Sequence, residues 1–167
     1  MSQFREPRSL DVAHRDSGPA AQEPHNPVRP RVLVIDDDVA VDDSFGEMLG
    51  AAGYDVHAEG TCTSGLAYLE REMPAVLILD LHLPDATGLE CLRRLRQLTQ
   101  HRRLPVAILT GDYFLDEEIA KELQTLGASV FFKPVWEDDL LRIVRQLLGD
   151  SSAADAADSA PPQRNQP

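Results

Sequence analysis

The sequence predicts an α/β fold in which a doubly wound, five-stranded parallel sheet carries helices on both faces. Short apolar runs of strand length alternate five times with stretches whose apolar residues recur at helical spacing. Continuous apolar runs are typical of parallel strands that are buried on both faces. Right-handed crossovers then limit the topology to a doubly wound sheet, whose ligands bind outside the carboxyl ends of the strands.

The predicted elements follow one another in a regular order. The strands are expected at residues 32–35, 54–58, 76–79, 106–109 and 130–132. The helices are expected at residues 41–52, 64–71, 89–98, 119–126 and 140–148. Gly53, Gly127 and Gly149 follow three of these helices and are placed to end them. Residues 31–149 are therefore expected to form one domain.

The two ends of the chain have a different composition. Residues 1–30 are rich in proline, residues 150–167 are mostly small and polar, and large apolar side chains are scarce in both. Such segments bury too little surface to offset the entropy of ordering them, so we expect a disordered N-terminal arm and a disordered C-terminal tail.

The sequence favours a cytoplasmic protein that does not contact a membrane. No stretch approaches the roughly 20 apolar residues that cross a bilayer, and the N-terminus lacks the apolar segment of a signal peptide. Cys62 and Cys91 show neither a metal-ligand spacing nor a disulfide framework. In a reducing compartment we expect two free thiols.

The charge of the chain argues against nucleic acid as a main partner. The formal net charge is −12, which would repel a phosphate backbone. Five arginines lie within eleven residues, at Arg93, Arg94, Arg96, Arg102 and Arg103. No aromatic residues interleave with them, so a solvated helix face and a basic loop are favoured over a nucleic-acid patch.

Polar side chains follow four of the five predicted strands. They are Asp36, Asp37 and Asp38 after the first strand, Asp80 after the third, Thr110 after the fourth and Lys133 after the fifth. The ends of these strands are neighbours in a doubly wound sheet, so the side chains are expected to meet. Taken singly, Asp38 is better explained as a helix N-cap, Thr110 as a turn hydroxyl and Lys133 as a solvated charge. Their coincidence at one edge favours a shared site.

This set of groups indicates phosphoryl chemistry. Clustered carboxylates repel one another and call for a cation, and an all-oxygen ligand set favours Mg²⁺ or Mn²⁺. A lysine and a threonine hydroxyl can contact phosphoryl oxygens, and a carboxylate can itself be the nucleophile, which gives an aspartyl phosphate. No Walker-type glycine loop is present to hold a nucleotide, so we expect the phosphoryl donor to be another protein or a small molecule.

Four motifs resemble those of the receiver domain of two-component response regulators, and the similarity covers residues 31–149. They are Val-Leu-Val-Ile-Asp-Asp-Asp (32–38), Leu-Ile-Leu-Asp-Leu-His-Leu-Pro-Asp-Ala-Thr-Gly (77–88), Ile-Leu-Thr-Gly (108–111) and Phe-Phe-Lys-Pro (131–134). The resemblance implies a flavodoxin-like sheet of strand order 2-1-3-4-5. Residues 150–167 are too short and too polar to fold as a DNA-binding unit, so we expect a stand-alone regulator, similar to chemotaxis regulators, without a DNA-binding output domain.

The resemblance assigns a role to each residue at the predicted edge. Asp80 would be the phosphoacceptor, and Asp36 and Asp37 the acidic pair that holds Mg²⁺, with Asp37 as a direct ligand. The main-chain carbonyl of His82 would complete the protein's share of the coordination. In the same way, Thr110 would be the switch hydroxyl and Lys133 the residue that contacts the phosphoryl group, with a cis peptide bond between Lys133 and Pro134.

Two further features concern signalling and phosphoryl lifetime. Receivers often carry a tyrosine or phenylalanine three residues before the lysine, whereas this chain has Val130, so the usual coupling of threonine and aromatic ring is in doubt. His82 and Asp112 lie two residues beyond Asp80 and Thr110. We hypothesise that their side chains flank the path of an attacking water and set the rate of autodephosphorylation.

The leading interpretation is a phosphoacceptor that receives its phosphoryl group from a histidine kinase or a histidine phosphotransfer protein. It would bind a downstream effector protein, and a homodimer would pair through the last two helices, as is common among receivers. The alternative is a receiver-like interaction module that acts without phosphorylation. An enzyme with an aspartate nucleophile, as in the haloacid dehalogenase group, would need a second aspartate where His82 stands.

Overall fold

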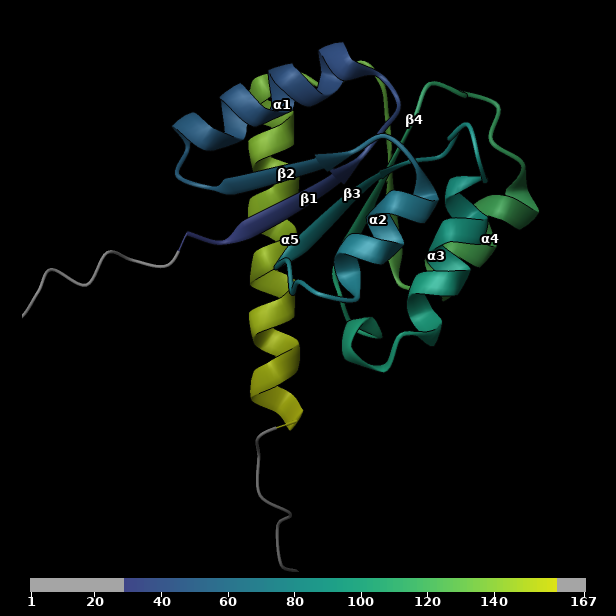
Figure 1. The fold of residues 1–167 in the computed structure, drawn as a ribbon. Coiled ribbons are helices and arrows are strands. Elements are labelled where there is room, and N and C mark those ends of the chain that lie inside the picture. Colours follow the sequence, from purple (N-terminus) through teal and green to yellow (C-terminus); the bar gives the residue numbers. More distant parts are fainter. Residues whose placement is uncertain (1–28, 159–167) are drawn as a thin grey trace, which may run out of the picture.

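The computed structural model describes residues 29–158, which form a five-stranded parallel sheet with helices on both faces (Figure 1). The strands are β1 (Arg31–Ile35), β2 (Asp55–Glu59), β3 (Val76–Asp80), β4 (Val106–Thr110) and β5 (Ala128–Phe132). The helices are α1 (Val39–Ala51), α2 (Cys62–Leu69), α3 (Gly88–Gln97), α4 (Glu117–Thr125) and α5 (Glu137–Asp158), with a short 3₁₀ helix, η1 (Thr99–His101). The strand order is β2-β1-β3-β4-β5, so the predicted topology is confirmed.

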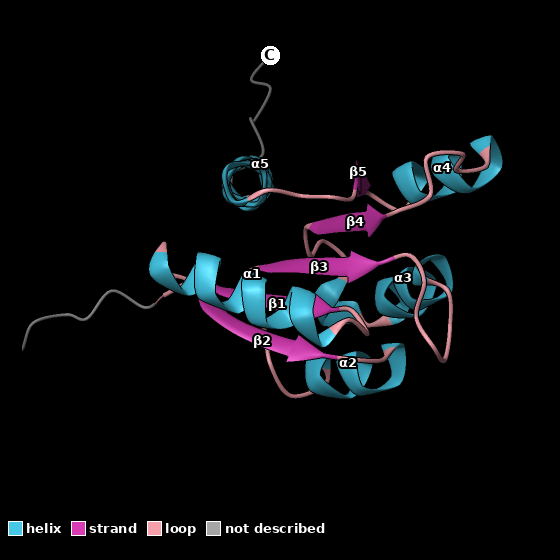
Figure 2. Cartoon of the chain, turned by 90° about the horizontal axis from the view of Figure 1, so that it is seen from above, coloured by secondary structure: helices cyan, strands magenta, loops and turns pink. Residues whose placement is uncertain are grey.

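The helices form two layers. Helices α1 and α5 cover one face of the sheet, and α2, α3 and α4 cover the other (Figure 2). Successive side chains of a strand point to opposite faces. Accordingly, Val34 of β1 packs in one cluster with Phe45 of α1 and Val144 of α5, whereas Leu33 belongs to the cluster that contains Leu92 of α3.

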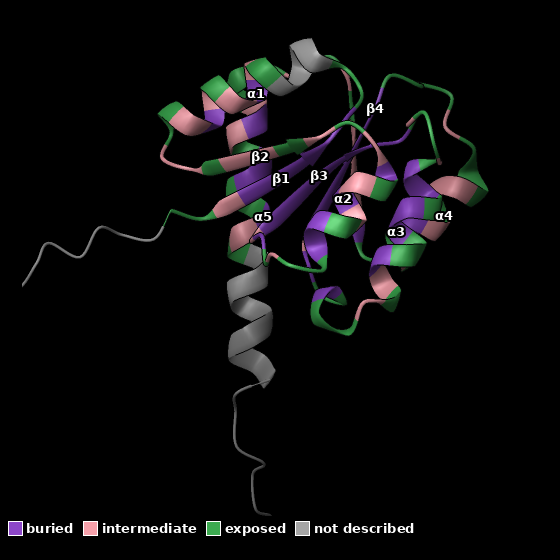
Figure 3. Ribbon diagram, in the orientation of Figure 1, coloured by how far each residue is buried: buried purple, intermediate pink, exposed green. Residues whose placement is uncertain are grey.

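The centre of the sheet is the most deeply buried part of the molecule. Every residue of β3 and β4 is buried, as the colouring of Figure 3 shows for the central strands. This double burial explains why both sequences are apolar up to their last residue. The last residues are polar, Asp80 in β3 and Thr110 in β4, and the fold therefore places a carboxylate and a hydroxyl side by side at the carboxyl edge.

The helix boundaries differ from the prediction by one to three residues, apart from the end of α5, and two of the differences have a local explanation. Helix α2 begins at Cys62, because the side chain of Thr61 caps it by accepting a hydrogen bond from the backbone N–H of Ser64. Helix α5 does not end at Gly149 but runs on to Asp158, through a stretch that contains four alanines, the residue of highest helix propensity. The predicted tail is thus helical as far as Asp158.

The remaining terminal residues, 1–28 and 159–167, lie outside the described part of the chain, and so does the disorder predicted for them. Between residues 29 and 158, no helix is long and apolar enough to span a bilayer.

Candidate functional site

The carboxyl edge of the sheet brings the predicted polar residues together. Asp36 follows β1 and is 2% exposed, Asp80 ends β3 and is 8% exposed, and Thr110 ends β4 and is fully buried. The ammonium group of Lys133, which follows β5, donates hydrogen bonds to Asp36 Oδ2 at 2.7 Å and to Asp80 Oδ2 at 3.1 Å. One cation therefore joins the ends of three strands.

Lys133 is held in its charged form by these contacts. Burial of the ammonium group alone would lower its pKa. The hydrogen bonds and charges of Asp36 and Asp80 outweigh burial and raise the pKa of Lys133 above its ordinary value of 10.5. The site therefore presents a fixed positive charge at neutral pH, directly beside the carboxylate of Asp80.

Three carboxylates at this edge form a cluster suited to a cation. One oxygen each from Asp36, Asp37 and Asp80 lies within 4.8 Å of the others. Both oxygens of Asp36 already accept hydrogen bonds, Oδ2 from Lys133 and Oδ1 from the backbone N–H of Asp38 at 3.0 Å. Asp37 is exposed. The cluster thus fits a hard divalent ion such as Mg²⁺, and the exposed Asp37 suits the predicted role of direct ligand.

Three backbone features lie around the cluster, at the positions of the predicted motifs. The backbone N–H of His82 lies 3.3 Å from Asp80 Oδ1, its hydrogen-bond acceptor, so this loop folds back onto the carboxylate. The peptide bond between Lys133 and Pro134 is cis, which confirms the prediction. Asp38, interpreted from sequence as a helix N-cap, directly precedes α1.

The hydroxyl of Thr110 is engaged by the loop that follows it. Thr110 Oγ1 accepts a hydrogen bond from the backbone N–H of Asp112 at 3.0 Å, and Asp112 Oδ1 accepts one from the backbone N–H of Phe114 at 2.9 Å. The main-chain carbonyl of Thr110 accepts a hydrogen bond from the backbone N–H of Lys133 at 2.8 Å. The β4–α4 loop is therefore tied to the Thr110 hydroxyl, and the end of β4 is tied to the backbone of Lys133.

Comparison with known proteins decides the family. A family model described as the response regulator receiver domain matches residues 32–145. The chain belongs to this family. Response regulator MprA of Mycobacterium leprae is 34% identical over 130 residues, which are 77% of this chain and 55% of the relative. An uncharacterized 14.6 kDa protein of Leptolyngbya boryana is 33% identical over 115 residues, which are 69% of this chain and 87% of the relative. The chain thus spans about half the length of MprA.

Solved structures agree with this assignment. The receiver is similar to the chemotaxis response regulator CheY4 of Vibrio cholerae, with 26% identity and a TM-score of 0.66 over 72% of this chain and 99% of the other. It is also similar to a CheY-like response regulator receiver domain protein from Methanospirillum hungatei JF-1. In that case the identity is 30% and the TM-score 0.70, over 75% of this chain and 98% of the other.

The receiver lacks an aromatic ring at the position three residues before Lys133. Val130 lies in β5, opposite Ile108 of β4, and packs against the core on the side of α2, α3 and α4. A different aromatic residue, which the sequence did not reveal, contacts the main chain of Lys133 from the β4–α4 loop. The hydroxyl of Tyr113 donates a hydrogen bond to the carbonyl oxygen of Lys133 at 2.5 Å.

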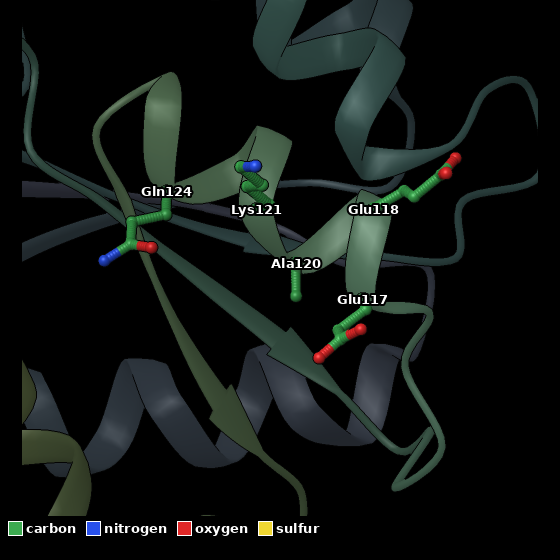
Figure 4. Close-up of a pocket in the computed structure, with 5 residues that line it drawn as sticks. All are labelled: Glu117, Glu118, Ala120, Lys121 and Gln124. Atoms are coloured by element: carbon green, nitrogen blue, oxygen red, sulfur yellow. The ribbon is translucent and has the colours of Figure 1, made fainter.

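His82 and Asp112 share a hollow of about 210 Å³ between the β3–α3 and β4–α4 loops. Leu81, Phe114 and Leu115 also line it. The two residues that we expect to influence phosphoryl lifetime therefore line the same pocket, which lies next to the loop that follows Asp80. A larger hollow of about 560 Å³ lies on α4 alone (Figure 4), and none of its lining residues belongs to the acidic cluster. It is lined by Glu117, Glu118, Ala120, Lys121 and Gln124.

The prediction of two free thiols is wrong. Cys62, the first residue of α2, and Cys91, in α3, form a disulfide with a Cα–Cα distance of 5.7 Å. Both side chains are buried between the two helices. Sequence spacing could not reveal the pair, because it depends on which helices become neighbours on that face of the sheet.

Beside the disulfide, Asp85 ties the β3–α3 loop to the start of α2. Its carboxylate accepts hydrogen bonds from the backbone N–H groups of Cys62 and Thr63, both at 2.9 Å, and from the Thr63 hydroxyl at 2.6 Å. The Thr63 hydroxyl and backbone N–H are the main causes that lower the pKa of Asp85. The loop that follows Asp80 is therefore fixed to α2.

Two of the five clustered arginines make structural contacts that the interpretation as a solvated helix face did not include. Arg93 forms a two-pronged ion pair with Glu122 of α4, at 2.6 and 2.7 Å. Arg96 is partly buried and donates to the main-chain carbonyls of Leu126, His101 and Leu104. These contacts fasten α3 to α4 and to the turn before β4.

Proposed function

We propose that this receiver domain accepts a phosphoryl group on Asp80 and signals by changing its binding to another protein. The observation that carries the proposal is the position of Lys133, whose ammonium group joins the carboxylates of Asp36 and Asp80. The buried hydroxyl of Thr110 ends the neighbouring strand. The carboxylate, the ammonium group and the threonine hydroxyl thus all lie at the carboxyl edge of the sheet.

The chemistry balances without a further reactant. A carboxylate oxygen of Asp80 attacks the phosphorus atom of the donor, and the bond from phosphorus to the donor's nitrogen or oxygen breaks. The leaving group takes the electron pair, and an acyl phosphate forms on Asp80. Lys133, already 3.1 Å from Asp80 Oδ2, is placed to turn to a phosphoryl oxygen. Attack of water on the phosphorus later restores the carboxylate and releases inorganic phosphate.

The acidic cluster supplies the ligands for a divalent ion in this proposal. Asp36, Asp37 and Asp80 would hold Mg²⁺, or Mn²⁺, together with the main-chain carbonyl of His82. When bound, the ion neutralises charge on the phosphoryl oxygens and helps to orient the group. Because three acidic groups meet one lysine here, the charge balance at the site favours such an ion.

We propose a phosphohistidine of a histidine kinase or of a phosphotransfer protein as the physiological donor. The receiver then catalyses only its own phosphorylation and dephosphorylation, in the cytoplasm. A downstream effector protein binds in response to the change.

One observation favours a second candidate, an interaction module that acts without phosphate. Val130 provides no ring to couple the switch hydroxyl to the surface.

The two candidates are separated by intact-mass measurement after incubation with acetyl phosphate and Mg²⁺. The first predicts one added phosphate on the wild type, and none on Asp80→Asn or in the presence of a metal chelator. Asp138→Asn is the matched control, because Asp138 is exposed in the first turn of α5, and it should be phosphorylated like the wild type. A wild type that takes no phosphate from any donor, or an Asp80→Asn variant that still does, would contradict the proposal.

A further inference from the structure

The main chain of Lys133 is held on both sides by the end of β4 and the loop that follows. Its backbone N–H donates to the carbonyl oxygen of Thr110 at 2.8 Å, and its carbonyl oxygen accepts a hydrogen bond from the Tyr113 hydroxyl at 2.5 Å. The Tyr113 ring also stacks on that of Phe132, with centroids 5.5 Å apart and planes 11° apart. One short segment therefore positions the backbone of the lysine that contacts Asp80.

The same segment holds the hydroxyl of Thr110. Thr110 Oγ1 accepts from the backbone N–H of Asp112, and the Asp112 carboxylate accepts from the backbone N–H of Phe114. These two bonds fix the loop on either side of Tyr113. A rotation of the Thr110 hydroxyl away from the Asp112 N–H would remove one of them and release the loop. The positions of the Thr110 and Tyr113 hydroxyls are therefore coupled through the hydrogen bonds of Asp112.

Tyr113 is held by contacts that can open. The residue is 64% exposed, so its position depends on the stack with Phe132 and on one hydrogen bond rather than on burial. Water can replace the hydroxyl's partner when the bond breaks, so the net cost of opening is small. In β5, Val130 cannot provide an aromatic connection of this kind, whereas Tyr113 and Phe132 supply one from the loop and the end of the strand.

We propose that Tyr113 is a positioning residue that acts through Lys133. Its hydroxyl holds Lys133 in the arrangement in which the ammonium group contacts the unmodified carboxylates of Asp36 and Asp80. The hydrogen bond from Tyr113 to Lys133 breaks when the Thr110 hydroxyl turns toward a phosphoryl group on Asp80. The inference rests on the proposed function, because it concerns the same site. It adds the residue that links phosphorylation to the exposed aromatic pair.

Loss of the Tyr113 hydroxyl should strengthen the binding of a phosphoryl mimic. A contact made in only one of two arrangements favours that arrangement, so its loss favours the other. Tyr113→Phe removes the hydroxyl and keeps the ring. The variant should bind beryllofluoride, a phosphoryl mimic, with Mg²⁺ more tightly than the wild type. The expected gain in affinity by titration calorimetry is about two- to tenfold, the size associated with one neutral hydrogen bond.

The matched control is Tyr54→Phe, which removes a hydroxyl just before β2, at the opposite edge of the sheet. Its affinity should equal that of the wild type. The melting temperature of the unliganded Tyr113→Phe variant should fall by at most a few degrees, because the lost hydrogen bond belongs to the unliganded arrangement. A purely structural hydroxyl would lower the melting temperature in the same way but would not tighten binding. Unchanged or weaker binding of beryllofluoride by Tyr113→Phe would overturn the role of Tyr113 alone. A wild type that does not bind beryllofluoride with Mg²⁺ would overturn the proposed function as well.

Discussion

Replacement of Gly88 by alanine tests how tightly the loop after Asp80 is packed. Gly88 is the first residue of α3, and its backbone N–H donates to the carbonyl oxygen of Leu81 at 2.8 Å. A Cβ atom at this position would overlap the carbonyl oxygen of Asp80 and lie 2.9 Å from Leu81 Cα. These neighbours are backbone atoms, so no side-chain rotation can relieve the clash.

The size of the effect follows from two opposing contributions. Alanine is favoured over glycine in a helix by about 1 kcal/mol at most. Overpacking of a well-packed region costs about 1–3 kcal/mol, and a clash with backbone belongs at the upper end of that range. Gly88→Ala should therefore lower the free energy of unfolding by about 1–2 kcal/mol. It should also slow phosphorylation by acetyl phosphate, because the displaced backbone carries Asp80.

Urea unfolding and intact-mass kinetics measure the two effects. Gly46→Ala is the matched control, since Gly46 lies in the middle of α1 and a Cβ there meets nothing within 4 Å. It should raise the free energy of unfolding by about 0.5–1 kcal/mol and leave phosphorylation unchanged. A Gly88→Ala protein as stable as the wild type, with the same phosphorylation rate, would refute the reasoning.

Three further predictions concern signalling, phosphoryl lifetime and pH. Val130→Tyr should alter binding of the partner protein more than the phosphorylation rate, and equal losses of both would count against this separation. Replacement of both His82 and Asp112 by alanine should change the autodephosphorylation rate severalfold, because they line one hollow beside the site, and an unchanged rate would remove them from the mechanism. Asp85 has a lowered pKa in the folded protein, so its ionised form stabilises the fold above its ordinary pKa of 3.8, and that contribution is lost as the pH falls through the lower value. The difference in urea midpoint between wild type and Asp85→Asn should therefore shrink below pH 3.8, and a difference that is the same at pH 3 and pH 7 would contradict this origin.

The fold and the convergence of polar residues could be predicted because both follow from local pattern. Apolar runs buried on both faces identify parallel strands, and parallel strands in a doubly wound sheet bring their carboxyl ends together. Asp80 and Thr110 end the two central strands, so their neighbourhood required no knowledge of loop structure. Lys133 follows the adjacent strand, and its contact with Asp80 was implied by the same rule.

The features that could not be predicted depend on loops and on helix packing. The bond from Tyr113 to Lys133 joins a loop to the residue after β5, and nothing in the local sequence of Tyr113 indicates its partner. The Cys62–Cys91 disulfide depends on the packing of α2 against α3. The extension of α5 past Gly149 shows that a glycine in a favourable helical sequence does not end a helix by itself.

The most direct test of the central claim is to locate the phosphoryl group. Borohydride reduces an acyl phosphate of aspartate to homoserine, which marks the modified position permanently. After phosphorylation with acetyl phosphate and Mg²⁺, peptide mass spectrometry should find homoserine at position 80, and only when the divalent ion is present. Homoserine at another aspartate, such as Asp36 or Asp37, or no conversion of a protein that carries phosphate, would contradict the assignment of Asp80 as the phosphoacceptor.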